Sequence, residues 1–290
     1  TPQTVTVTGV NDNNSDGHQE YDISLSAANV LTNNPEVTTL AGSGTATFAN
    51  GTGTAASFYL PKGITSDGTN LYVSDTDNNR IRKIVISTGV VTTLVGSGTA
   101  TFADGNGEAA SFSAPTGITG DGTYIYVADE GNRRLRRIEI ATGEVTTLAG
   151  TGSTNCVDSA TGTSAKISKP EGLTTDGTNI YLQTCMKILK YNISSTAVTT
   201  IAGSGYQQND DGTGSSAHFY WPRDSTILGN ILYVATGNAL VRAIDISTDP
   251  GLNEGVVTSF SWAHLGNNTA ITNDGTHLYV ASSRHIIYKL

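Results

Sequence analysis

The sequence has little charge, and what it has is mostly negative. Charged residues make up 14% of the 290 positions, with 16 Lys and Arg against 25 Asp and Glu, so the formal net charge is −9. A diffuse negative field repels phosphate backbones, which argues against a nucleic-acid partner. No apolar run approaches the roughly eighteen residues of a membrane span, so we expect no membrane insertion.

Cysteine and methionine are also scarce, with two Cys and one Met. Cys156 and Cys185 cannot form a structural zinc site alone, because such a site normally needs a fuller set of ligands. A disulfide between them would fit an oxidising compartment. The chain starts at Thr1 with no visible signal peptide, and we interpret it as a mature or excised product. The acidic, Ser/Thr/Asn/Gly-rich composition then favours an extracellular or cell-surface location.

What the sequence does have is an internal repeat. The segment Val37-Thr-Thr-Leu-Ala-Gly42 recurs in close copies at Val91, Val145 and Val198, with spacings of 54, 54 and 53 residues, and more loosely at Val257. A second marker, Tyr between two aliphatic residues, occurs five times, at Tyr72, Tyr126, Tyr181, Tyr233 and Tyr279. Self-similarity at such a period is the mark of a repeat architecture.

Each repeat reads as four short strands. In the first repeat the predicted strands are Gly63–Thr65, Asn70–Ser74, Arg80–Ser87 and Val90–Val95, with a tight turn at Asp67-Gly68. Four antiparallel strands repeated about five times are typical of a propeller. The sequence therefore predicts an all-β fold, a five-bladed β-propeller of four-stranded antiparallel blades over residues 36–290.

The ends of the chain suggest how the ring would close. The last repeat stops at Leu290, after its third strand, whereas the outer-strand sequence at 37–42 precedes the first inner strand. We expect residues 37–42 to lie beside 285–290 as the outer strand of the last blade. This N-terminal strand would complete that blade and remove its exposed edge.

Several segments resemble the NHL repeat of bacterial extracellular proteins: Pro115-Thr-Gly-Ile118, Tyr126-Val-Ala-Asp129 and Asn132 to Ile138. The resemblance covers residues 36–290 and implies a propeller that acts as a binding platform for protein, carbohydrate or nucleic acid, with enzymes as a minority. The first two blades match best. The later blades replace the motif's Asp by Thr184, Thr236 and Ser282.

Residues 1–35 lie outside the predicted ring. Thr4–Gly9 and Glu20–Leu25 read as two strands that resemble the closing strands of Calx-β or Ig-like repeats in surface proteins. A lone hairpin is barely stable. It would pack on the propeller, continue an upstream domain or pair with another molecule, including another copy in a filament.

The candidate binding residues lie in the long loops between blades. The repeated Phe58, Phe112 and Phe219 are expected to fill gaps between blades, whereas the unrepeated aromatics are candidates for contacts. These contact candidates are Tyr59, Tyr206, Tyr220 and Trp221.

A second group of candidates follows the blade prolines. Together with Thr269 at the equivalent position of the last repeat, Lys62, Thr116, Glu171 and Arg223 are expected to surround one mouth of the central tunnel. Either a Lys62–Glu171 or a Glu171–Arg223 ion pair would be possible there.

Two further features concern the cysteines and calcium. Cys156 and Cys185 fall in loops of the same predicted face, so they form a disulfide or stay as two separate thiols. Asp12, Asn14 and Asp16 offer oxygen ligands at alternate positions, as in a calcium loop, but Ile23 stands where an EF-hand has its bidentate Glu. An ordinary polar turn is therefore the preferred interpretation, and calcium is the alternative. No other cofactor is predicted.

No catalytic grouping stands out, and the five histidines occupy unrelated repeat positions. We therefore expect a non-catalytic extracellular binding or assembly module, with protein, other copies or glycan as partner. The alternative is a calcium-dependent propeller enzyme, a lyase or hydrolase with its site in the central tunnel.

Overall fold

The computed structural model describes residues 37–247, 255–261 and 268–290. The chain separates into two compact units, Thr1–Thr38 and Thr39–Leu290. The predicted hairpin within 1–35 and the calcium candidates Asp12, Asn14 and Asp16 lie outside the described residues. Over the described ranges, no helix is long and apolar enough to cross a membrane.

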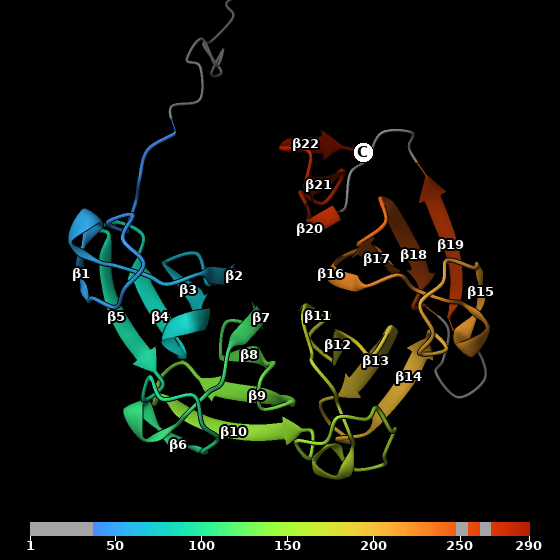
Figure 1. Ribbon diagram of the computed structural model, residues 1–290, viewed down its shortest axis with the longest axis horizontal. Coiled ribbons are helices and arrows are strands. Elements are labelled where there is room, and N and C mark those ends of the chain that lie inside the picture. Colours follow the sequence, from blue (N-terminus) through green and yellow to red (C-terminus); the bar gives the residue numbers. More distant parts are fainter. Residues whose placement is uncertain (1–36, 248–254, 262–267) are drawn as a thin grey trace, which may run out of the picture. The chain divides into compact units, whose positions relative to one another are not determined.

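The second unit consists of five antiparallel sheets that follow one another around a common axis (Figure 1). The first blade comprises β2 (Pro61–Ser66), β3 (Asn70–Asp75), β4 (Arg80–Val85) and β5 (Val90–Val95). The second comprises β7 (Pro115–Gly120), β8 (Tyr124–Asp129), β9 (Arg134–Glu139) and β10 (Glu144–Ala149). The third comprises β11 (Leu173–Thr175), β12 (Asn179–Thr184), β13 (Lys187–Asn192) and β14 (Val198–Ala202). The fourth blade comprises β16 (Pro222–Leu228), β17 (Ile231–Thr236), β18 (Leu240–Asp245) and β19 (Val256–Ser261), and the fifth β20 (Asn268–Asn273), β21 (Leu278–Ser282) and β22 (Ile286–Lys289). The predicted five-bladed propeller is confirmed.

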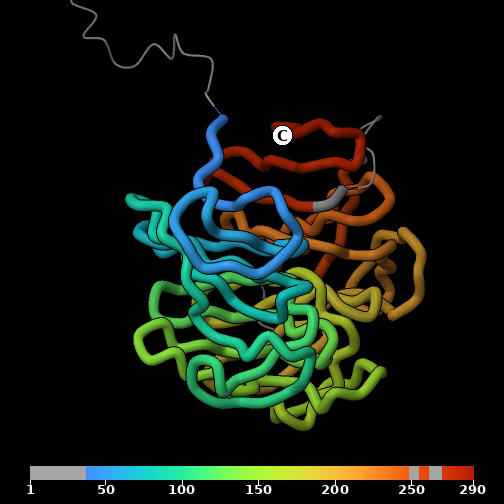
Figure 2. The backbone as a smooth tube through the Cα atoms, turned by 60° about the vertical axis from the view of Figure 1, so that its left-hand side comes forward, coloured from blue at the N-terminus to red at the C-terminus, as the bar shows by residue number. Residues whose placement is uncertain are grey.

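The loops between blades add short strands that the repeat did not predict. β1 (Gly51–Thr52), β6 (Gly105–Asn106) and β15 (Gly212–Thr213) pair with the outer strands of blades one, two and four. The loops before the inner strands of blades one to four each contain a 3-10 turn: η1 (Gly53–Ala55), η3 (Gly107–Ala109), η4 (Gly162–Ser164) and η5 (Gly214–Ser216). A further 3-10 turn, η2 (Thr76–Asn78), follows β3. Figure 2 shows the blue loop ahead of β2 folding back over the first sheet.

Hydrophobic clusters between neighbouring blades form the core. Tyr72, Ile81 and Val95 of the first blade pack with Phe112 and Ile125 of the second, and all five are almost fully buried. Strand alternation explains this, because every second side chain faces the next sheet. Phe112 and Phe219 are completely buried in such clusters, as predicted for the repeated phenylalanines.

The turn between the first and second strands of a blade is held by its aspartate. Asp67 accepts hydrogen bonds from the N–H groups of Thr69 and Asn70 and from the Tyr72 hydroxyl at 2.7 Å. Burial, followed by the bond to Asp67, raises the pKa of Tyr72 to about 12. The same Asp-to-Tyr bond recurs in blades two, three and five, so the repeated Tyr serves the fold.

The predicted closing strand is not found. Among the described residues the last sheet contains only β20, β21 and β22, and residues 37–42 form no strand. Gly42 instead donates its N–H to the carbonyl of Gly53 in the first blade at 3.0 Å. The prediction was wrong because a strand sequence fixes which side chains are apolar but does not bring a partner edge within hydrogen-bonding distance.

Candidate binding channel

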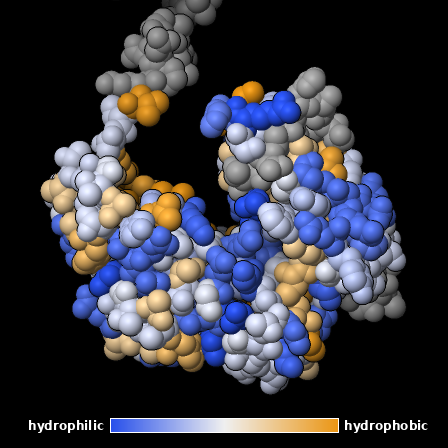
Figure 3. Space-filling view, viewed as in Figure 1, coloured by the Kyte–Doolittle hydropathy of each residue, from blue (hydrophilic) through white to orange (hydrophobic). Residues whose placement is uncertain are grey.

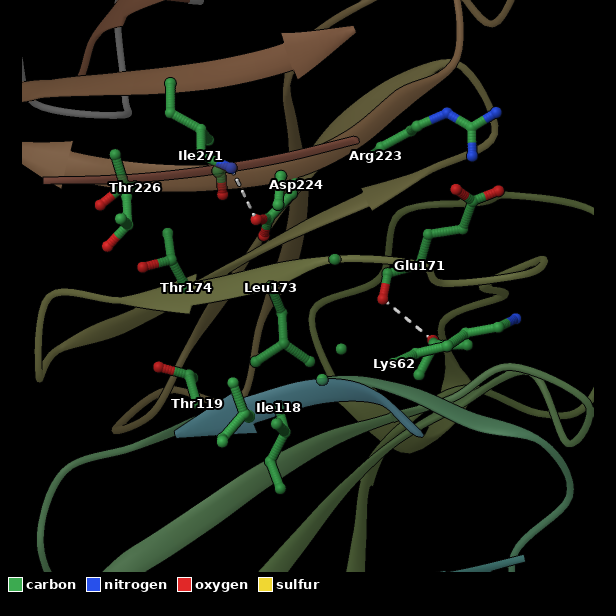
Figure 4. Close-up of a pocket in the computed structure, with 18 of the residues that line it drawn as sticks. Lys62, Ile118, Thr119, Glu171, Leu173, Thr174, Arg223, Asp224, Thr226 and Ile271 are labelled. Carbon is green, nitrogen blue, oxygen red and sulfur yellow. Dashed lines mark hydrogen bonds between the residues drawn. The ribbon is translucent and has the colours of Figure 1, made fainter. Parts of the chain in front are cut away.

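A cavity of about 980 Å³ runs along the inner strands of all five blades. In the space-filling view the surface around this central hollow is largely hydrophilic (Figure 3). Its wall is layered. In the close-up, Lys62, Glu171 and Arg223 lie toward one end, Thr119, Thr174 and Thr226 toward the other, and hydrophobic residues lie between them (Figure 4).

Five threonines occupy the same position of the repeat, one on the inner strand of each blade. All five line the cavity: Thr65, Thr119, Thr174, Thr226 and Thr272. Within the described part of the chain, only the Thr226 hydroxyl among these five has a side-chain partner: it accepts a 2.6 Å hydrogen bond from the amide of Asn273. The channel therefore contains a ring of hydroxyl groups that sequence reasoning did not single out, although its signal was present in every repeat.

Four of the five residues predicted at the mouth, Lys62, Thr116, Glu171 and Arg223, line the cavity. The side chain of the fifth, Thr269, lies outside the described part of the chain. Thr116 has a structural part, since its buried hydroxyl donates to the backbone carbonyl of Glu171 at 2.9 Å. That carbonyl also accepts the N–H of Gly117 at 2.8 Å, so the backbone holds the two inner strands together and leaves the Glu171 carboxylate directed at the mouth.

The predicted ion pairs are not formed. No oxygen of the Glu171 carboxylate lies within 4.0 Å of a nitrogen of Lys62 or Arg223, and Lys62 pairs instead with Glu130 at 3.9 Å. Glu130 was missed because it belongs to the turn after β8, in the neighbouring blade. Only the ring arrangement brings that turn beside Lys62.

Glu171 and Arg223 therefore face the same mouth with their charges unpaired. Burial raises the pKa of Glu171, and the nearby Arg223 partly opposes that rise. The Arg223 Nε is buried without a hydrogen-bond partner among the described residues, and its guanidinium carbon lies 5.7 Å from the centre of the Trp221 ring. The mouth thus offers one anion and one cation beside an aromatic face.

Glycine controls how closely the inner strands approach. A Cβ at Gly63, Gly117 or Gly172 would lie 2.2–2.4 Å from a carbonyl oxygen of the next blade, which no side chain permits. The fourth blade carries Asp224 at this position. Its Oδ2 accepts the N–H of Ile271 from the fifth blade at 3.0 Å, and burial raises the pKa of Asp224 to about 6. Sequence reasoning did not identify this carboxylate.

Arg136 lies in the arginine-rich stretch from Arg133 to Arg137. Its guanidinium is completely buried and donates to Asp129 at 2.7 Å, as Arg82 donates to Asp75 in the first blade. Arg134 lies over the Phe102 ring at 3.8 Å. These are packing contacts, because they tie the loop before a blade to its second and third strands.

The third blade confirms the disulfide. Cys156 and Cys185 are bonded, with their Cα atoms 6.3 Å apart, and join the long loop to the turn after β12. No three His, Cys, Asp or Glu side chains gather as a possible metal site in the parts of the chain that the structure describes.

The aromatic candidates differ in accessibility. Tyr206 is 73% exposed, Trp221 45% and Tyr59 41%, while Tyr220 is half-buried with its ring centre 6.0 Å from that of Trp221. Trp221 also has a left-handed backbone, with φ of 45°. Tyr59 and Trp221 lie close in sequence to Lys62 and Arg223, whereas Tyr206 lies earlier in its loop.

The chain is similar in sequence to parts of two larger proteins. No family model matches the chain. It is 34% identical over 112 residues to human NHL repeat-containing protein 2, covering 36% of this chain and 15% of that protein. It is 26% identical over 251 residues to the Arabidopsis thaliana Protein SUPPRESSOR OF QUENCHING 1, chloroplastic, covering 76% and 24%. The chain thus spans about a quarter or less of these relatives.

Solved structures show the same fold. A nidogen/laminin complex matches with a TM-score of 0.58 and 16% identity over 80% of this chain and 75% of that one. Streptogramin B lyase matches with a TM-score of 0.51 and 14% identity over 79% and 68%. At such identities the likeness concerns the fold alone. The chain is thus a five-bladed β-propeller whose repeats are similar in sequence to part of NHL repeat-containing protein 2.

Proposed function

We propose that this chain is a non-catalytic, extracellular binding module that holds a protein segment at the channel mouth. The observation that carries the proposal is the unpaired arrangement of Glu171 and Arg223 beside the exposed Trp221. Glu171 is exposed and Arg223 is half-buried, so a ligand that supplies the opposite charges can reach both and form charge-assisted hydrogen bonds with them.

The chemistry of the mouth fits a peptide with mixed charge. A carboxylate of the partner would accept hydrogen bonds from Arg223, and a Lys or Arg of the partner would pair with Glu171. Trp221 offers a large apolar ring of the kind enriched at interaction hot spots. Because Lys62 and Glu130 neutralise each other, the mouth has no excess charge that would favour a purely acidic or purely basic ligand.

Two further observations support an extracellular protein partner. The Cys156–Cys185 disulfide is of the kind that persists in oxidising compartments. The nidogen/laminin structure that shares the fold is a complex between proteins. A glycan is the competing ligand, because sugar rings also stack on tryptophan and the threonine ring could bind hydroxyl groups.

The test is selection from a displayed library of random heptapeptides, run in parallel with a glycan array. We expect retained peptides with an acidic and a basic residue, and a loss of affinity of at least tenfold in Arg223→Ala and in Glu171→Gln. Lys83→Ala, on β4, is the matched control and should bind like the wild type. Selective retention of glycans, or peptide binding that ignores both substitutions, would overturn the proposal.

A channel enzyme is the second candidate, and Asp224 favours it, since a carboxyl group with a pKa of about 6 lines the cavity. Streptogramin B lyase has the same fold. In that case Asp224→Asn would abolish turnover of a lyase or hydrolase substrate while leaving peptide binding intact. Under the binding proposal Asp224 bonds Ile271 and serves only the seam between blades.

A further inference from the structure

The last blade has an open edge. Its sheet runs in the order β20-β21-β22 and, within the described residues, no strand follows β22, whereas each of the other four blades continues into a further strand. Open edges pair readily with any extended segment that offers matching backbone groups. This edge lies on a strand remote in sequence from the mouth residues Glu171 and Arg223.

The last and first blades expose apolar side chains toward the central cavity, whereas their counterparts are buried against a neighbouring blade. Ile287 of β22 is 73% exposed. The residues at its position in the other four blades are Ile81, Leu135, Ile188 and Val241, and all are 0% exposed. Ile64 on the inner strand of the first blade is 61% exposed, whereas Ile118, Leu173 and Ile271 at the same position are between 4% and 7% exposed.

The sequence also contains a strand with no sheet. Val37-Thr-Thr-Leu-Ala-Gly42 repeats the outer strands of the first three blades, yet residues 37–42 form no strand. Val37 is 96% exposed and Leu40 41%, whereas Val91 and Val145, the counterparts of Val37, are 1% exposed. Gly42 anchors the end of this segment on the first blade through its bond to Gly53.

Among the residues that the structure describes, one chain thus presents both a segment with an outer-strand sequence and a sheet edge to which no further strand is paired. We propose that the edge of β22 binds Val37–Ala41 of a second copy as its fourth, antiparallel strand. The first blade supplies the register, in which Ile84 pairs with Val91, Lys83 with Thr92 and Ile81 with Val95. If the corresponding residues of the last blade keep this register, Leu290 pairs with Val37 of the second copy, Lys289 with its Thr38 and Ile287 with its Ala41.

This pairing is strand addition, in which backbone hydrogen bonds give affinity and alternate side chains give specificity. Ala41 would lie beside Ile287, on the face that Ile81 and Val95 occupy in the first blade. Val37 would lie on the opposite face beside Leu290, as Val91 lies beside Ile84. The contact joins two different surfaces, so copies would add head to tail, and an interface of this type gives open chains when its rotation does not close a ring. The inference goes beyond peptide binding at the mouth and does not depend on Glu171 or Arg223.

Engineered cysteines test the pairing directly. The two native cysteines are bonded to each other, so they leave the new thiols as the reactive pair. Thr38→Cys and Lys289→Cys are made in separate chains, mixed and oxidised, and we expect a disulfide-linked dimer on a non-reducing gel. The chain that carries both substitutions should give a ladder of multimers. Ser87→Cys, on an exposed turn of the first blade, replaces Lys289→Cys in the control and should give no such dimer.

The competing possibility is that residues 37–41 of the same chain bind at the β22 edge. If the doubly substituted chain forms only an internally linked monomer, or if no link forms in the mixture, the proposal is wrong. A second measurement does not require cysteine. Val37→Asp should weaken assembly at least tenfold in sedimentation velocity without changing the melting temperature, while Thr38→Asp should not, because its counterpart Thr92 is exposed in the first blade.

Discussion

The first two blades and the third solve the same packing problem with different chemistry. In the second blade Arg136 is buried between Asp129, at 2.7 Å, and the Phe102 ring, whose centre lies 5.0 Å from the guanidinium carbon. The first blade has the same arrangement with Arg82, Asp75 and Phe48. Each ties the long loop before the blade to its second and third strands.

The third blade has lost all three partners. Thr184 stands in place of the Asp, the fully buried Leu189 in place of the Arg, and Cys156 in place of the Phe. The disulfide from Cys156 to Cys185 now fixes the same loop. Its turn is shorter, and both Cys185 and Met186 have positive φ, as a two-residue hairpin turn requires. A covalent bond has replaced an ionic one at one site of the repeat.

The fourth blade is an intermediate case. It keeps the buried arginine as Arg242 but has Thr236 where the Asp stood. Arg242 donates to the carbonyls of His218 and Asp210 and to the carboxylate of Asp211, all in the loop before the blade. Arg136 makes the same three kinds of bond to its own loop in addition to the bond to Asp129. The comparison shows that the loop bonds alone can hold a buried arginine at this position.

The largest effect is expected from breaking one ion pair. Asp129→Ala removes the fully buried one of the two carboxylates that pair with Arg136, and leaves only the partly exposed Asp104 at 2.7 Å. It should lower the free energy of unfolding by about 3–5 kcal/mol in urea titrations. Asp77→Ala, an exposed carboxylate of the first blade, is the control and should stay within about 0.5 kcal/mol of the wild type. A loss below about 1 kcal/mol for Asp129→Ala would mean that the pair adds no stability.

The double substitution Asp129→Thr with Arg136→Leu sharpens the comparison, because it gives the second blade the residues that the third blade has at these two positions, Thr184 and Leu189. Replacing both partners of a buried pair by less polar groups is far less costly than removing one. We expect the double variant to be more stable than Asp129→Ala by at least about 2 kcal/mol in the same titration. A double variant as unstable as the single one would show that the third blade depends on its disulfide alone.

A somewhat smaller effect is expected from removing that disulfide. Cys156 and Cys185 are separated by 29 positions, and closing a loop of this length stabilises a folded chain by about 3–4 kcal/mol in the chain-entropy model. Cys156→Ser with Cys185→Ser should lower the free energy of unfolding by up to that amount. Reduction of the wild type should match the double variant, and any larger effect of reduction would contradict this account.

The smallest effect concerns pH at the seam between blades four and five. Burial raises the pKa of Asp224 from its ordinary 3.8 to about 6, so between these values the folded chain binds more protons than the unfolded chain. Stability from this group is therefore highest below pH 4 and falls as pH rises to 6, by about 2–3 kcal/mol. The difference in unfolding free energy between wild type and Asp224→Asn should follow that fall, and a flat difference would exclude Asp224 as its origin.

Local features of the candidate site were predictable because they follow the repeat. The position after each blade proline brought Lys62, Glu171 and Arg223 to one mouth, as their spacing indicated. Cys156 and Cys185 lie in two loops that the repeat places on the same face of the propeller, so their disulfide was also predictable. The ring of five threonines was readable in the same way, from identical residues at one position of the inner strands.

Contacts across the seams between blades were not predictable. Lys62 pairs with Glu130 instead of Glu171, and Asp224 replaces a seam glycine to reach Ile271, because blade geometry sets which turn meets which strand. The burial of Arg136 has the same origin, since its partners come from a loop and a strand far apart in the chain.

The sequence by itself determined the number of blades, their strands and the face that carries the long loops, because periodic apolar residues and turn glycines act locally. The tertiary structure alone decided the pairing of charges at the channel and the state of the last edge. Those depend on distances between segments, and a segment such as 37–42 has the pattern of a strand without carrying any information about which edge it meets.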